Sequence, residues 1–131
     1  MRHLTAVVVG VICLLAGCHR APSVAERVQT AGGPVALKRD CQTFFASWNG
    51  VDESWIPSVL SNLPPVIVAL RPQILTVHQK GGLPVVDIQV AGGFTHQGVI
   101  VALTNAPASF LPSKPGWKVR RIGDGVYAYD E

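Results

Sequence analysis

The chain has 131 residues, of which 48% are hydrophobic and 15% are charged, and its formal net charge is +3. This length fits a single domain. So small a net charge is not the strongly basic balance of nucleic-acid-binding proteins, and the composition therefore predicts no nucleic-acid partner.

The first 17 residues have the three parts of an export signal. Arg2 supplies a positive charge, residues 6–15 (AVVVGVICLL) form an apolar run, and Ala16 and Gly17 are small enough for a signal peptidase. As a helix, the uncharged stretch 4–17 would reach about 21 Å. That is shorter than the roughly 30 Å of hydrocarbon that a spanning helix must cross. The sequence therefore predicts a signal peptide over 1–17 that is removed.

The residues at the predicted cleavage site carry a family resemblance. Leu15-Ala16-Gly17-Cys18 resembles the lipobox of bacterial lipoproteins at every position. The resemblance implies that the Cys18 thiol is acylated and that Cys18 becomes the first residue of the mature chain. Acyl chains contribute about 0.8 kcal/mol per buried methylene group and would anchor the domain at a membrane. In this family an aspartate after the cysteine favours the inner membrane, so His19 favours a periplasm-facing position at the outer membrane. The alternative is an ordinary signal peptide with a chance cysteine.

Residues 18–40 are predicted to be the lipidated cysteine and a tether. Within this segment Ser23 and Glu26 match a capping box, and Gly32-Gly33-Pro34 would end the short helix that it begins. As a flexible coil the tether would reach about 25 Å. It would therefore hold the folded domain, predicted over 41–131, close to the bilayer.

The folded domain is predicted to begin with a helix capped by Asp40. Cys41, Phe44, Phe45 and Trp48 recur at the spacing of one helical face. Cys13 leaves with the signal peptide and Cys18 is lipidated, so Cys41 has no partner for an internal disulfide. Its place on the apolar face favours a buried structural role over that of a nucleophile.

A second helix is predicted from Ser54, with Pro57 in its first turn. Its apolar face would contain Ile56, Val59, Leu60 and Leu63. The pattern continues past Pro64-Pro65, but the β-branched residues that follow prefer strands. Whether 64–71 is helix or strand therefore stays open.

From residue 72 the apolar period changes to two, which predicts five strands at 74–80, 83–91, 97–103, 116–122 and 125–130. A two-residue turn at Gly81-Gly82 would place Val77 opposite Val86 and Leu75 opposite Ile88. The predicted fold is α+β, with N-terminal amphipathic helices packed on one face of an antiparallel four- to five-stranded meander. Residues 104–115 would form one long loop.

The sequence contains no strong catalytic motif, no metal-ligand spacing and no cofactor fingerprint. The weak candidate is the glycine-rich stretch with Gly92, Gly93 and His96, where the histidine could act as a general base. A turn whose histidine bonds the local backbone is the favoured alternative. His78 and Asp87 are expected on one face of the sheet, where a surface pair is the favoured reading.

The C-terminal hairpin is the best candidate surface for a glycan or an envelope-protein partner. It combines Trp117, Arg120, Tyr127 and Tyr129, residue types that dominate contact energetics. Ordinary cross-strand packing is the alternative.

Together these features predict a non-enzymatic, lipid-anchored envelope protein that binds a ligand or partner at the membrane surface. One alternative is a small hydrolase-like accessory enzyme that uses His96 with Asp87 or Cys41. Another is a structural spacer. Outside the lipobox, no family of known function is recognised.

Overall fold

The structure is a computed structural model that describes residues 20–90 and 96–130. Its helices are α2 (Val24–Ala31), α3 (Pro34–Phe44) and α4 (Pro65–Ala69), with a 3₁₀ turn, η1 (Pro57–Val59). Its strands are β1 (Glu53–Trp55), β2 (Pro72–Lys80), β3 (Leu83–Val90), β4 (Gln97–Ala102), β5 (Lys118–Gly123) and β6 (Val126–Asp130). Cys18, Gly92 and Gly93 lie outside the described residues.

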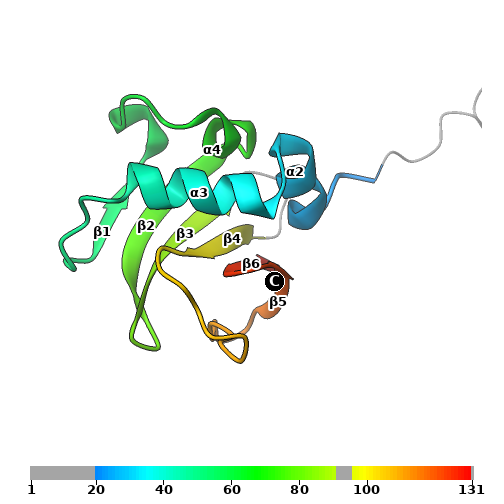
Figure 1. Ribbon diagram of the computed structural model, residues 1–131. Coiled ribbons are helices and arrows are strands. Elements are labelled where there is room, and N and C mark those ends of the chain that lie inside the picture. Colours follow the sequence, from blue (N-terminus) through cyan, green and yellow to red (C-terminus); the bar gives the residue numbers. More distant parts are fainter. Residues whose placement is uncertain (1–19, 91–95, 131) are drawn as a thin grey trace, which may run out of the picture.

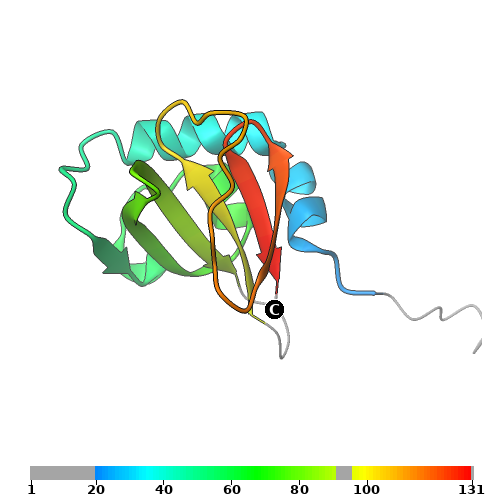
Figure 2. The ribbon, with the colours of Figure 1, turned by 90° about the horizontal axis from the view of Figure 1, so that it is seen from below.

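All six strands form one antiparallel sheet in the order β1-β2-β3-β4-β6-β5. The predicted α+β class is confirmed, and each of the five predicted strands is present. The prediction of a four- to five-stranded meander is wrong, because β1 adds a sixth strand and β6 lies between β4 and β5. The loop from β4 to β5 is long enough to carry the chain past the position that β6 later fills (Figures 1 and 2).

The β2–β3 hairpin has the predicted register. Val77 pairs with Val86 and Leu75 pairs with Ile88. Gly81 and Gly82 have φ values of 55° and 79°. Two successive positive φ angles are what a two-residue turn matched to the strand twist requires, and glycine adopts them without a steric cost.

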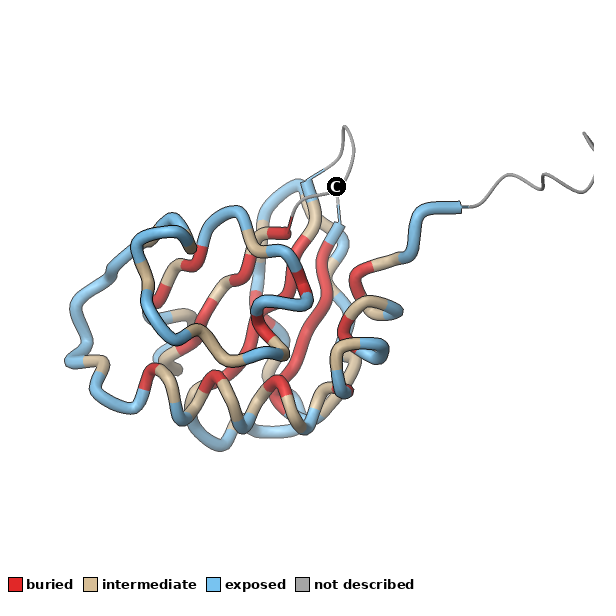
Figure 3. Tube along the Cα trace, turned by 90° about the horizontal axis from the view of Figure 1, so that it is seen from above, coloured by how far each residue is buried: buried red, intermediate tan, exposed pale blue. Residues whose placement is uncertain are grey.

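Two hydrophobic clusters lie against the sheet. The larger cluster joins residues of all three helices to alternate residues of β2, β3, β4 and β6, among them Leu37, Cys41, Ile67, Leu75, Val77, Val86, Ile88, Val99, Val101 and Val126. The smaller cluster contains Val85, Ile100, Tyr127 and Tyr129, with Phe110 and Trp117 packed against it. Val85 belongs to the smaller cluster and Val86, the next residue of β3, to the larger one. Because successive side chains of a strand point to opposite faces, the two clusters lie on opposite faces of the sheet. Figure 3 shows the buried positions recurring along the strands and the helices.

Helices α2 and α3 meet at Gly32-Gly33-Pro34. The Ser23–Glu26 capping box is confirmed, and Gly32 ends α2 with a φ of 135°. The predicted helix start at Asp40 is wrong, because α3 begins at Pro34. Proline is favoured at the first helical position, where its missing N–H has no intrahelical partner to lose.

Most of the segment predicted as a tether is therefore folded. Residues 24–40 lie mainly in α2 and α3, and Val24, Val28 and Leu37 are buried in the larger cluster. The flexible-tether interpretation does not describe these residues.

The helix predicted from Ser54 is also wrong. Residues 53–55 form β1, and the Ser54 and Thr76 hydroxyls share a hydrogen bond of 2.9 Å across the β1–β2 pair. The supposed apolar face is divided: Ile56 is 64% and Val59 is 70% exposed, whereas Leu60 and Leu63 pack against the larger cluster. Pairing with the edge of the sheet has overridden the local helical spacing. For residues 64–71 the sequence did not decide between helix and strand. The structure shows a short helix there, α4, over 65–69.

Candidate functional site

The carboxylate of Asp87 accepts hydrogen bonds from two other side chains of the domain. It lies in β3, directly opposite Thr76 of β2. The Tyr129 hydroxyl donates to Asp87 Oδ1 at 2.6 Å, and Lys114 Nζ donates to Oδ2 at 2.8 Å. The side chains of Asp87 and Lys114 are only 13% and 22% exposed. We call Asp87, Lys114 and Tyr129 the Asp87 cluster. Its hydrogen bonds are charge-assisted and are therefore stronger than hydrogen bonds between neutral groups.

The Lys114 ammonium group also lies over two aromatic rings. Its Nζ is 3.7 Å from the centre of the Tyr129 ring and 4.9 Å from that of Trp117. A ring face attracts a cation, so the carboxylate and the two rings hold the amine in one place. Burial, followed by the neighbouring Asp87 carboxylate, raises the pKa of Tyr129. The phenol therefore stays protonated and remains a hydrogen-bond donor to Asp87.

A glycine in the adjacent strand makes room for this arrangement. Gly98 of β4 pairs with Tyr129 of β6. A Cβ at Gly98 would overlap the Tyr129 side chain and the Ile88 carbonyl oxygen. Gly98 is therefore needed because any side chain at this position would exclude the Tyr129 side chain from its place over β4.

An open pocket of about 360 Å³ lies beside the Asp87 cluster. It is lined by Ser54, Ile74, Thr76, Asp87, Gln89 and Lys114. Ser54, Thr76 and Asp87 form one row across β1, β2 and β3. The pocket therefore offers hydroxyl, carboxylate, amide and ammonium groups along an apolar side chain, Ile74. We call it the sheet groove.

The structure brings together some of the predicted hairpin residues and separates others. Trp117 packs edge-on against Tyr129 with ring centres 5.1 Å apart, and the His96 ring lies 5.7 Å from that of Trp117. Tyr127 is buried and packs edge-on against Phe110. Arg120 pairs with Ala128, a residue of the larger cluster, and so projects to the opposite face from Tyr129.

Two residues of the enzyme alternative, Cys41 and Asp87, lie on opposite faces of the sheet. Cys41 is buried in the larger cluster, and burial raises the pKa of its thiol well above the ordinary value. Asp87 lies on the other face of the sheet, with its oxygens bonded to Lys114 and Tyr129. The predicted His78–Asp87 pair is not formed, and His78 Nδ1 is buried without a hydrogen-bond partner in the structure.

Sequence reasoning missed Lys114, because it lies in the long loop, 27 residues from Asp87. Across residues 20–90 and 96–130, no three His, Cys, Asp or Glu side chains are arranged to hold a metal ion. None of the helices in the same ranges has the length and apolar character needed to cross a membrane. Comparison of the chain with protein-family models, curated proteins and solved structures finds no match.

Proposed function

We propose that this chain is a lipid-anchored cell-envelope protein whose folded domain binds a neutral glycan in the sheet groove. The anchor rests on the resemblance of residues 15–18 to the lipobox. We further infer that the helices cover one face of the sheet, so that the groove on the other face remains open to a ligand. The observation that carries the binding proposal is the row of polar side chains across β1, β2 and β3 beside the Asp87 cluster.

The chemistry of the groove suits a molecule rich in hydroxyl groups. Such a ligand both donates and accepts hydrogen bonds, and the groove supplies both kinds of partner. The Gln89 amide forms no hydrogen bond inside the described part of the chain. An ionised carboxylate offers about four acceptor positions, of which Asp87 uses one on each oxygen for Tyr129 and Lys114. Ile74, 42% exposed, offers an apolar contact for the C–H face of a sugar ring.

The enzyme and spacer alternatives make different predictions about the same surface. An enzyme that used His96 as a general base would lose about 100-fold or more of its turnover in His96→Ala. A spacer would bind no ligand in the groove. Glycan binding that depends on groove residues, without turnover, distinguishes the proposed function from both.

The test is calorimetric titration of the mature protein in detergent with chitotetraose and maltotetraose. We expect saturable binding of at least one of them, weakened roughly 3- to 10-fold by Gln89→Ala because one hydrogen bond is lost. Gln79→Ala is the matched control, since Gln79 is an exposed β2 residue that does not line the groove. Absence of binding, or equal weakening by both variants, would reject the proposal.

A further inference from the structure

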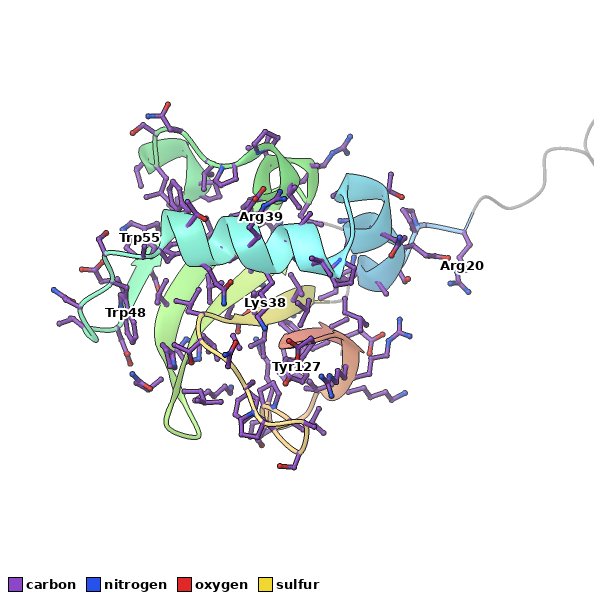
Figure 4. All side chains as sticks on the ribbon, in the orientation of Figure 1. Arg20, Lys38, Arg39, Trp48, Trp55 and Tyr127 are labelled. Atoms are coloured by element: carbon purple, nitrogen blue, oxygen red, sulfur yellow. The ribbon has the colours of Figure 1, made fainter. Side chains whose placement is uncertain are left out.

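A second pocket, of about 260 Å³, lies beyond the C-terminal end of α3. It is lined by Phe44, Phe45, Ser47, Trp48, Asn49, Glu53, Trp55 and Leu60. We call it the aromatic pocket. It shares no lining residue with the sheet groove. Figure 4 shows Trp48 and Trp55 at this end of α3, on the side of the domain away from Arg20.

The rings of the aromatic pocket are held in fixed relative positions. Phe45 stacks on Trp55 with ring centres 5.8 Å apart, and Phe44 meets Phe45 edge-on at 5.0 Å. Trp48 Nε1 donates to the Val51 carbonyl oxygen at 2.6 Å. The Val51 N–H in turn donates to Asn49 Oδ1 at 3.2 Å. The loop after α3 therefore orients the Trp48 indole before any ligand arrives.

The aromatic pocket is also locally acidic. Glu53 and Trp55 alternate with Ser54 along β1 and therefore project to the same side of the strand. Glu53 is exposed and forms no ion pair within the described residues. Residues 41–70 include Asp52 and Glu53 but no lysine or arginine, although the whole chain has a net charge of +3. The last turn of α3 carries no basic residue, so the negative end of its dipole is not offset.

We propose that the aromatic pocket binds a quaternary ammonium group. Ring faces attract such a cation, and recognition of trimethylammonium groups by aromatic side chains is the established use of this interaction. A quaternary ammonium group has no N–H donor, so it does not need the close acceptors that a primary amine needs. Glu53 supplies the opposite charge, and the rings contact the methyl groups. The group belongs either to a free solute or to a lipid headgroup.

The first test is a tryptophan-fluorescence titration of the mature protein in detergent with choline. Its neutral isostere, 3,3-dimethyl-1-butanol, has the same shape without the charge. We expect saturable quenching by choline and about 2- to 30-fold weaker binding of the isostere, because the cation–π attraction is lost. Equal binding of the two compounds, or no binding of choline, would overturn the proposal.

Two acidic neighbours provide the matched variants. Glu53→Gln should weaken choline binding about 2- to 5-fold, as expected for an exposed charge pair. Asp52→Asn should weaken binding less than Glu53→Gln does, since Asp52 does not line the pocket and contributes only a more distant charge. Both residues are exposed, so the variants should keep the thermal midpoint of the parent. Unchanged binding in Glu53→Gln, with the fold intact, would contradict the proposal.

The two sources of the group are separated with vesicles. The protein is reconstituted into phosphatidylcholine or phosphatidylglycerol vesicles, and the tryptophan emission is compared before and after choline is added. A lipid headgroup as the ligand predicts shifted emission in phosphatidylcholine alone and a reduced response to choline there. A free solute predicts the same choline response in both vesicles. No choline response in either vesicle, with unshifted emission in phosphatidylcholine, would reject both sources.

Discussion

Cys41 illustrates how one side chain's surroundings decide its chemistry. It lies on α3 within the larger cluster and has no exposed surface. A thiol reacts as the thiolate, and burial, followed by the nearby Asp40 charge, raises the pKa of Cys41. The protonated form is therefore the stable form throughout the physiological pH range. The sequence predicted a buried, structural cysteine, and the structure confirms that Cys41 is buried.

We expect Cys41 in the mature native protein to resist alkylation by iodoacetamide and to react after denaturation. Cys41→Ser should lower the free energy of unfolding by about 1–3 kcal/mol, because a hydroxyl without a partner would replace the thiol. Mass spectrometry measures the alkylation, and urea unfolding measures the stability. Rapid alkylation of the folded protein would contradict the buried position and revive the nucleophile interpretation.

The Asp87 cluster shows the same dependence on surroundings for a charged residue. A carboxylate that is 13% exposed would be costly to bury alone. Here Lys114 supplies the opposite charge, and Tyr129 supplies a neutral donor. Asp87 and Tyr129 were candidates in the sequence, but for separate sites, because Tyr129 belongs to a strand two positions away in the sheet. Lys114 comes from a loop.

At the scale of elements, α2 and α3 are part of the folded domain. The two helices bury Val24, Val28 and Leu37 in the cluster that also contains the strand residues. Lys38 of α3 donates to Asp124 Oδ2 at 2.9 Å and links the helix to the β5–β6 turn. A segment that forms these contacts stabilises the domain.

Leu37→Ala tests this conclusion directly. Leu37 is fully buried, so we expect the free energy of unfolding to fall by about 2–5 kcal/mol as a cavity forms. Val35→Ala is the matched control on the same helix, because Val35 is 81% exposed and should change stability by less than about 0.5 kcal/mol. Similar small effects of both variants in urea unfolding would mean that α3 does not pack on the domain.

At the scale of the whole molecule, the described domain contains no helix that could cross a membrane, and the proposed anchor is the lipid on Cys18. The proposed lipid attachment site, Cys18, is five residues before the α2 capping box that begins at Ser23. Because so few residues separate Cys18 from α2, we expect the anchored domain to lie close to the bilayer. This proximity suits both a headgroup ligand and a glycan of the envelope.

We expect Cys18→Ser to abolish incorporation of labelled palmitate and to leave the signal peptide uncleaved, because the acceptor thiol is gone. Metabolic labelling and the mass of the purified chain provide the measurements. Cys41→Ser is the matched control. It should still be labelled, because it keeps Cys18 and because Cys41 is buried in the folded domain. Continued labelling of Cys18→Ser would show that the lipobox interpretation is wrong.

The sequence by itself determined those features whose physics is local. Two adjacent glycines set the β2–β3 turn, and the alternating side chains on either side set its register. Ser23 and Glu26 cap α2 from positions three residues apart. A capping box or a two-residue hairpin involves neighbours along the chain, so its energetics can be judged from the residue types alone.

Only the tertiary structure decided which distant segments meet. Ser54 could cap a helix, yet pairing with Thr76 makes it part of a strand. β6 could have ended a meander, yet it fills the place between β4 and β5. Lys114 reaches Asp87, and Trp48 and Trp55 line one pocket, because packing brings their segments together. These contacts depend on how well surfaces far apart in the chain fit each other, and no local pattern records that fit.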